Sequence, residues 1–136
     1  MDRLKTKIAG ASKALARLKE VTGIDEVPAI TRDAAIQRFE FTFEAIWKVA
    51  KMYLREIEGL ELGSPKGVLR ACMQVGILSD EETSLGLEMV DDRNLTSHNY
   101  NEELSISIYE RLDEYLWLLT LWLERIEKTI LTTLNQ

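Results

Sequence analysis

The sequence predicts an all-α protein, and three observations lead to that prediction. The 136-residue chain contains only seven glycines and two prolines, too few for a turn-rich β architecture. Apolar residues recur at the spacing of amphipathic helices along most of the chain, and helix-capping signals stand between these stretches. We therefore expect a single domain over residues 1–136, folded as an antiparallel, up-and-down bundle of four to five helices.

The first half of the chain predicts two long helices. Residues 2–20 form an amphipathic helix with a basic outer face, and residues 21–31 connect it to the next helix. The second helix is expected from about Thr31, which would be its N-cap, to about Glu58. Its apolar stripe consists of Phe39, Phe43, Ile46, Ala50, Tyr53, Leu54 and Ile57.

The second half predicts three more helices. Ser64 followed by a proline predicts the cap and first position of a short helix over residues 65–75, which Gly76 ends. The segment from Ser79 to Glu82 matches a capping box, so a fourth helix begins there and runs toward residues 91–98. The last helix is expected over about 102–131.

The middle of the last helix, residues 115–123, is apolar nearly all round. A helix of a small bundle usually leaves one face to water, so this pattern predicts a homodimer through the fourth and fifth helices, with further pairing into larger assemblies left open. The alternative is a central helix that the other four surround. The run is far shorter than the ~20 apolar residues that span a bilayer, so we expect no membrane segment.

The composition favours a cytoplasmic protein. The N-terminus lacks the apolar core and the cleavage site of a signal peptide. The single cysteine, Cys72, cannot form an internal disulfide and has no companions for a zinc site. Its position beside apolar residues of the short helix predicts a small core residue.

The charge of the chain is unevenly distributed. The formal net charge is −6, which argues against a general nucleic-acid binder. Residues 1–19 nevertheless carry six basic residues and one acidic residue, whereas residues 80–103 carry eight acidic residues and one basic residue. A phosphate backbone bound near the second region would need cations from the first helix, Lys48, Lys51 or Arg55. The alternative is that the basic residues form a solvated helix face.

The stretch DDRNLTSHNY, residues 91–100, contains the only histidine of the chain, His98. If the fourth helix continues through it, Asn94 and His98 are neighbours on one face. Arg93 and His98 then lie roughly 140° apart around the helix axis. They could act together only if the helix ended near Ser97, if the arginine curled back, or if a second subunit contributed.

These residue types suit cleavage of a phosphodiester without a metal ion. A histidine can move a proton to or from a ribose hydroxyl, and an arginine can stabilise the charge that grows on the phosphate. Asn94 could orient His98 or donate to phosphate. Metal catalysis is not expected, because one histidine and scattered carboxylates provide no recognisable ligand spacing. From spacing alone, a histidine that caps a helix end or lies on the surface remains the alternative.

The chain resembles the HEPN domains, and within them the HepT-like family. Arg93, four intervening residues and His98 match the arginine–histidine motif, and Asn99 and Tyr100 continue it as in the HepT branch. The segments RFEFTFEAIWK at 38–48, SPKGVLRACMQVGIL at 64–78 and DDRNLTSHNYNEE at 91–103 extend the resemblance over nearly the whole chain. Relatives often carry a tryptophan in the turn before the motif, where this chain has residues 83–85, Thr-Ser-Leu.

The resemblance implies a function as well as a HEPN-like bundle. Members are expected to dimerise with the two motifs facing a shared cleft and to act as ribonuclease toxins without a cofactor. Their partner is a minimal nucleotidyltransferase antitoxin, which adds adenylyl groups to the tyrosine that corresponds to Tyr100. A phosphate-bearing group two residues from His98 would block RNA by volume and by charge. The alternative is a substrate-binding partner subunit of the nucleotidyltransferase that cuts nothing.

Several other residues have two interpretations. Phe39, Phe41, Phe43 and Trp47 could form a base-stacking platform, but Phe39 and Phe43 lie on the apolar stripe and are expected in the core. Phe41 lies about 200° from Phe39 around the helix axis and is a candidate for an interface with the partner. Trp117 and Trp122 are expected in the core or in a dimer contact. Glu40 and Glu44 could imitate a pair of catalytic carboxylates, but a solvated face with an ion pair from Glu44 to Lys48 is the expectation.

Overall fold

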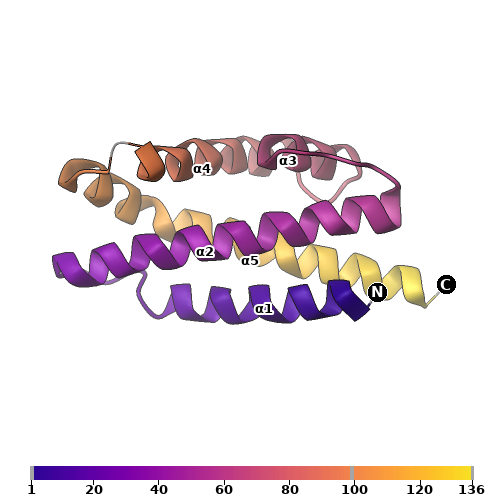
Figure 1. Ribbon diagram of the computed structural model, residues 1–136, viewed down its shortest axis with the longest axis horizontal. Helices are drawn as coiled ribbons and strands as arrows, with labels where there is room; N and C mark the ends of the chain where they lie inside the picture. The colour runs from indigo at the N-terminus through magenta and orange to yellow at the C-terminus, as the bar shows by residue number, and fades with distance from the viewer. Residues whose placement is uncertain (1, 99, 136) are drawn as a thin grey trace.

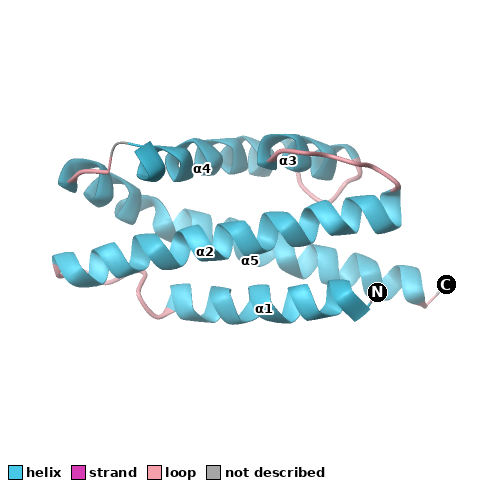
Figure 2. Ribbon diagram, in the orientation of Figure 1, coloured by secondary structure: helices cyan, strands magenta, loops and turns pink. Residues whose placement is uncertain are grey.

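The computed structural model describes residues 2–98 and 100–135, and in that part of the chain the regular structure is helical, with no strand (Figure 2). This confirms the predicted all-α class. The elements, in chain order, are α1 (Asp2–Lys19), α2 (Ala29–Tyr53) with the π-helical turn η1 (Leu54–Glu58), α3 (Pro65–Gln74), α4 (Asp80–His98) and α5 (Glu102–Leu134).

The four long helices run up and down beside one another, as predicted (Figure 1). The short α3 lies beside the first half of α4 and contacts α2 as well. The yellow and orange α5 contacts α1, α2 and α4. The end of α4 and the start of α5 lie together at one end of the molecule, where residues 91–100 are found.

The core is built from the apolar stripes of these helices. Phe39 and Phe43 are fully buried, as predicted, and the ring of Phe39 stacks on Tyr115 of α5 with 5.6 Å between the ring centroids. Trp122 is also fully buried, and its Nε1 donates to Cys72 Sγ over 3.4 Å. Burial raises the pKa of the Cys72 thiol to about 11, so Cys72 is an inert core residue, as expected from the sequence.

Most of the predicted helix ends are confirmed by their caps. The Ser64 hydroxyl accepts from the Gly67 amide at 3.1 Å. The capping box is complete: the Ser79 amide donates to the Glu82 carboxylate at 2.8 Å, and the Glu82 amide donates to the Ser79 hydroxyl at 3.2 Å. Gly76 ends α3 with a φ of 85°, a conformation that favours glycine.

The predicted start of the second helix at Thr31 is wrong. Helix α2 begins at Ala29, and Pro28 occupies the N-cap in an extended conformation without a side-chain cap. The fixed φ of proline sets the direction in which the chain enters the helix, so the first turn forms before Thr31 and needs no hydroxyl. The far end also differs in type, since α2 gives way to η1 at Leu54 before Gly59 turns the chain with a φ of 72°.

The apolar stretch 115–123 is largely buried within one copy of the chain. Tyr115, Leu118, Leu119, Trp122 and Leu123 face the core and are at most 2% exposed. The packing of α5 on α1, α2 and α4 therefore accounts for most of the apolar pattern, although α5 keeps an exposed face and is not surrounded by the other four helices. Trp117 is the exception, because 56% of its surface is exposed.

Candidate functional site

Helix α4 continues without a break through His98, so the residues of the motif are distributed around a helix. Arg93 is half-buried and faces α2, whereas Asn94 and His98 are exposed on another face. Within residues 2–98 and 100–135, no hydrogen bond joins His98 to another side chain. The structure thus brings Asn94 and His98 to one face, as expected for an unbroken helix, and points Arg93 away from His98.

Arg93 is held by three contacts. Its Nη2 lies 3.1 Å from Glu44 Oε2, its Cζ lies 5.7 Å from the centroid of the Phe43 ring, and its Nη1 donates to Asn94 Oδ1 over 3.4 Å. Its Nε is buried and meets no acceptor among the described residues. The outer edge of the guanidinium is therefore the part that can meet a ligand, and about a third of the side chain is exposed.

Glu44 joins two cations. Besides Arg93 it pairs with Lys48 Nζ at 3.2 Å, which confirms the ion pair expected from the sequence. Burial raises the pKa of Glu44, but the Trp47 N–H, Lys48 and the charge of Arg93 outweigh it and bring the pKa below its usual value. The Trp47 Nε1 is buried, and no described acceptor meets it in good hydrogen-bond geometry, so its influence on Glu44 is that of a nearby dipole.

A buried acid fixes α4 at the level of the motif. Asp92 is 5% exposed, accepts a hydrogen bond from the Tyr115 hydroxyl and pairs with Arg111 at 3.0 Å. Both partners belong to α5. Burial, followed by the hydrogen bond and charge of Asp92, raises the pKa of Tyr115 well above its usual range. Because Asp92 precedes Arg93, these contacts set the rotation of α4 that turns Arg93 toward α2.

Tyr100 follows α4, and its side chain is 46% exposed. The Tyr100 hydroxyl forms a hydrogen bond within the protein, since it donates to Asp33 Oδ1 at 2.6 Å. Burial and this hydrogen bond raise the pKa of Tyr100. Nearby, the Arg32 Nε donates to Ser105 Oγ at 3.1 Å. The flanking Asn99, which the sequence places in the motif, lies outside the described residues.

The sequence singles out Arg93, Asn94, His98 and Tyr100, but it does not reveal three acids that contact them or hold their helix. Glu44 is expected only as a partner of Lys48 or as half of a carboxylate pair with Glu40, and Asp33 and Asp92 are not singled out. Each is brought to the motif by packing between helices that are distant in the chain. Only Asp92 could have been noticed in the sequence, because it is an acidic residue at a position of α4 that faces the core.

Residues 2–98 and 100–135 contain no group of three or more His, Cys, Asp or Glu side chains that could hold a metal ion. No helix found there is both long enough and apolar enough to cross a membrane.

The antiparallel helical bundle that carries this motif at the end of α4 has the same fold as a solved HEPN toxin. The chain belongs to the family of nucleotidyltransferase substrate binding protein-like proteins, whose model matches residues 6–128. This confirms the family that the sequence resembles.

Three relatives illustrate the range of similarity. A protein of known crystal structure from Thermus thermophilus is 55% identical, with a TM-score of 0.82 over 85% of this chain and 98% of that chain. The probable ribonuclease HepT of Haemophilus influenzae is 28% identical over 85% of this chain and 86% of its own length. A tri-AMPylated HEPN toxin of Shewanella oneidensis, in complex with MNT antitoxin, is 20% identical, with a TM-score of 0.78 over 94% of this chain and 98% of that chain. The last similarity concerns the fold alone.

Proposed function

We propose that the protein is a HEPN-type toxin, a metal-independent endoribonuclease that is paired with a minimal nucleotidyltransferase antitoxin. The observation that carries the proposal is the exposure of His98, Asn94 and Tyr100 together at the end of α4. An exposed histidine beside an amide can supply proton transfer, and an arginine of the same motif can supply phosphate binding. The name of the Haemophilus influenzae relative, probable ribonuclease HepT, supports the same reaction.

In the proposed reaction a ribose 2′-hydroxyl attacks the adjacent phosphorus. A new oxygen–phosphorus bond forms as the bond to the 5′ oxygen breaks, which leaves a cyclic phosphate and a free 5′-hydroxyl. His98 moves the proton between the attacking and leaving oxygens, and Arg93 binds the oxygens on which negative charge grows. Asn94 donates to phosphate or orients His98 on the face that they share.

The divergence of Arg93 and His98 on one helix supports a homodimer. Two copies that appose their α4 helices would bring the two motifs into one cleft and supply both groups to one phosphate. Leu95 lies between the two residues in the motif and is 43% exposed, and Trp117 of α5 is 56% exposed. Exposed apolar side chains of this size are typical of interfaces, so α4 and α5 are the proposed contact surface.

We propose that the antitoxin neutralises the toxin by adenylylation of Tyr100. The phenolic oxygen would attack the α-phosphorus of ATP, forming a phosphodiester as the bond to the β-phosphate breaks and pyrophosphate leaves. The phenolic proton would pass to Asp33, which already accepts the hydrogen bond. The partial exposure of the Tyr100 ring supports access by another enzyme. The added phosphate would repel RNA next to His98.

The experiment that tests the ribonuclease is cleavage of a fluorescent single-stranded RNA by the purified protein in the presence of a chelator. Cleavage should continue without metal, and His98→Ala should lower its rate at least about 100-fold while leaving the helical circular dichroism unchanged. Arg93→Ala should also abolish cleavage and growth inhibition, and Arg93→Lys should restore little, since an ammonium cannot bind phosphate as a fork. Loss of cleavage on chelation, or full toxicity of His98→Ala, would refute the proposal.

A second function has one specific observation in its favour. Arg93 is already paired with Glu44, and the Tyr100 hydroxyl is already bound to Asp33. A protein arranged in this way could serve as a non-catalytic substrate-binding partner subunit of the nucleotidyltransferase. The two functions differ in outcome: the partner subunit would form a tight complex with the nucleotidyltransferase and cleave no RNA, with or without the antitoxin.

A further inference from the structure

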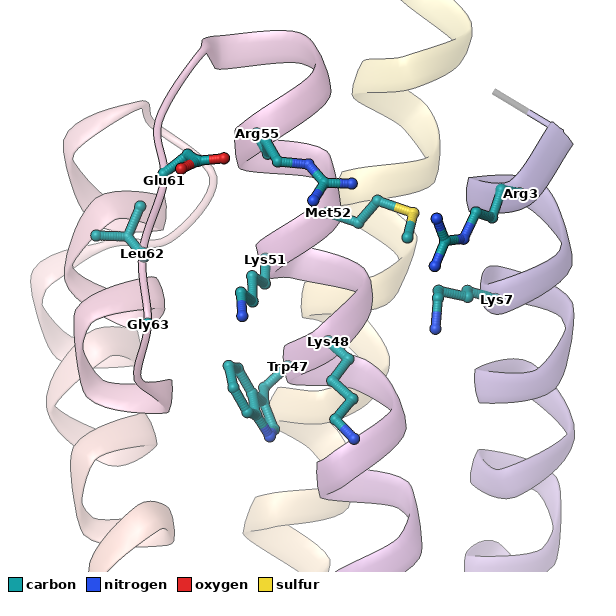
Figure 3. Close-up of a pocket in the computed structure, with 10 residues that line it drawn as sticks. All are labelled: Arg3, Lys7, Trp47, Lys48, Lys51, Met52, Arg55, Glu61, Leu62 and Gly63. Atoms are coloured by element: carbon teal, nitrogen blue, oxygen red, sulfur yellow. The ribbon is translucent and has the colours of Figure 1, made fainter.

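A groove lined by basic side chains runs along the outward side of α2, with α1 on one side and the loop after η1 on the other (Figure 3). The cavity has a volume of about 520 Å³. Its five cationic residues, which with Trp47 we call the basic groove, are Arg3, Lys7, Lys48, Lys51 and Arg55. Glu61 is the one acidic side chain among the described residues that line it.

The charge around the basic groove is opposite in sign to the net charge of the chain. The chain as a whole carries −6, yet five positive charges and one negative charge surround this single cavity. Like charges held around a concave surface reinforce one another and attract anions from a distance. A solvated helix face, the alternative left open by the sequence, would distribute these side chains over a convex surface instead.

The spacing of the cations suits a chain of phosphates rather than a single anion. Lys48, Lys51 and Arg55 recur three and four residues apart on one face of the α2–η1 helix, and they span roughly 10 Å along its axis. Across the groove, Arg3 and Lys7 stand one turn apart on α1 and point toward α2 (Figure 3). Two rows of cations that face each other can contact several phosphates in succession.

The small size of the groove favours a single strand over a duplex. Its cavity of about 520 Å³ lies between α2, α1 and the loop after η1, so one phosphate backbone can lie in it, whereas a duplex could meet only its rim. Trp47 and Met52 form the floor, but they are only 9% and 7% exposed, and Lys51 Nζ lies 5.8 Å from the centroid of the Trp47 ring. The contacts that the groove offers are therefore mainly those of its cations.

The groove is connected to the motif through Glu44. One oxygen of this carboxylate binds Lys48, which lines the groove, and the other binds Arg93. The two cations therefore lie on either side of one carboxylate. A strand that contacts Lys48 with one phosphate is in position to present a neighbouring phosphate to Arg93.

We propose that the basic groove binds the phosphate backbone of single-stranded RNA and leads it to Arg93. This inference rests on the proposed ribonuclease function, because it names the path of that enzyme's substrate. The groove supplies affinity without sequence preference, since its contacts are to phosphates.

The test measures binding separately from cleavage. All proteins carry His98→Ala, and their affinity for a short fluorescent single-stranded RNA is measured by anisotropy at several salt concentrations. The groove variant is K48Q/K51Q/R55Q. The matched control is K5Q/K13Q/K19Q, which removes the same charge from exposed positions of α1 and its end that do not line the groove. Thermal unfolding of each variant verifies that it is folded.

The groove variant should lose at least about tenfold in affinity at moderate salt. The slope of log K against log salt should fall in magnitude by about 2, because each lost contact to a single strand removes about 0.7. The control should change affinity less than twofold. Equal losses in the two variants or an unchanged groove variant would each overturn the inference. Binding of the His98→Ala protein to anionic lipid vesicles or duplex RNA in preference to single-stranded RNA would also overturn it. A protein that binds RNA through the groove but never cleaves it would refute the ribonuclease alone.

Discussion

The guanidinium of Arg93 on α4 is ion-paired to the carboxylate of Glu44 on α2, with 3.1 Å between Nη2 and Oε2. The pair joins residues 49 positions apart in the chain, and the same carboxylate also holds Lys48. A phosphate that approaches Arg93 must therefore compete with a charge already in place. Glu44 both orients the proposed catalytic arginine and opposes the binding of its substrate.

Glu44→Gln should strengthen RNA binding. The amide keeps the size of the side chain and an oxygen that can accept from Arg93, but it removes the competing charge. In the His98→Ala background we expect the Kd for single-stranded RNA to fall about fivefold, the effect of roughly 1 kcal/mol that a partly exposed charge contributes. Glu40→Gln, one helical turn away, removes the same charge and should change the Kd little. Weaker binding by Glu44→Gln alone would mean that orientation of Arg93 outweighs competition.

Homodimerisation should depend on Trp117. Sedimentation equilibrium of the wild-type protein at micromolar concentration should give the mass of a dimer or of a larger assembly of dimers. Trp117→Glu places a charge on the proposed contact surface and should yield a monomer. Leu131→Glu is the matched control, since Leu131 is 59% exposed near the other end of α5. A wild-type monomer would remove the shared cleft on which the proposed pairing of Arg93 with His98 depends.

The ion pair between Glu82 and Arg125 should make stability depend on pH. The two side chains meet through two bonds, of 2.6 and 2.9 Å, and Glu82 also completes the cap of α4. These interactions, against the opposing effect of burial, lower the pKa of Glu82 in the folded state. The stabilisation is therefore present above the pKa of the unfolded chain and is lost as the pH falls through the folded pKa.

Glu82→Gln should accordingly unfold more easily than wild type at neutral pH, by about 1 kcal/mol, as expected for the loss of a cap. The difference should shrink as the pH is lowered below the pKa of the unfolded carboxyl, about 4.3, and should be lost once the pH passes below the lowered pKa of the folded carboxyl. Urea unfolding at several pH values measures both. Glu81→Gln, the exposed neighbour, serves as the control. A difference that stays constant down to acidic pH would exclude the charge of Glu82 as its cause.

The features predicted correctly from the sequence are those that depend on neighbours in the chain. The serine caps at Ser64 and Ser79 and the glycine turn at Gly76 each join residues a few positions apart, so a local pattern is sufficient to reveal them. The apolar stripes likewise identified Phe39 and Phe43 as core residues. Thr31 was misplaced because Pro28, also a local residue, offers a competing way to begin a helix.

The partners of the motif could not be predicted in this way. Asp33, Glu44 and Asp92 contact residues that lie 67, 49 and 23 positions away. Which acid meets which partner depends on how the helices are rotated against one another, and periodicity does not encode that rotation between distant segments. The burial of residues 115–123 shows the same limit, since it depends on how α5 packs against α1, α2 and α4.

Tyr100→Phe should prevent adenylylation of the protein without affecting its cleavage of RNA. The phenylalanine lacks the oxygen that would bond to phosphorus, so incubation with the cognate nucleotidyltransferase and ATP should add no adenylyl mass at position 100. RNA cleavage should remain at the wild-type rate and should no longer fall during the incubation. Intact-mass analysis with peptide mapping, run beside the cleavage assay, gives both results. Absence of adenylyl mass on wild-type Tyr100, with a tight unmodified complex, would favour the partner-subunit function.

Asp33→Asn should slow the modification of Tyr100. The phenol is a poor nucleophile because burial and Asp33 raise its pKa, so a base must take its proton as the bond to phosphorus forms. Asp33 lies 2.6 Å from the hydroxyl and is placed to accept that proton, which an asparagine cannot do. We expect the rate of adenylylation to fall at least about tenfold at saturating ATP, within the range for loss of a general base. Glu103→Gln, an exposed acid at the start of α5, should leave the rate unchanged. Faster modification of Asp33→Asn would show that Asp33 restrains the hydroxyl instead.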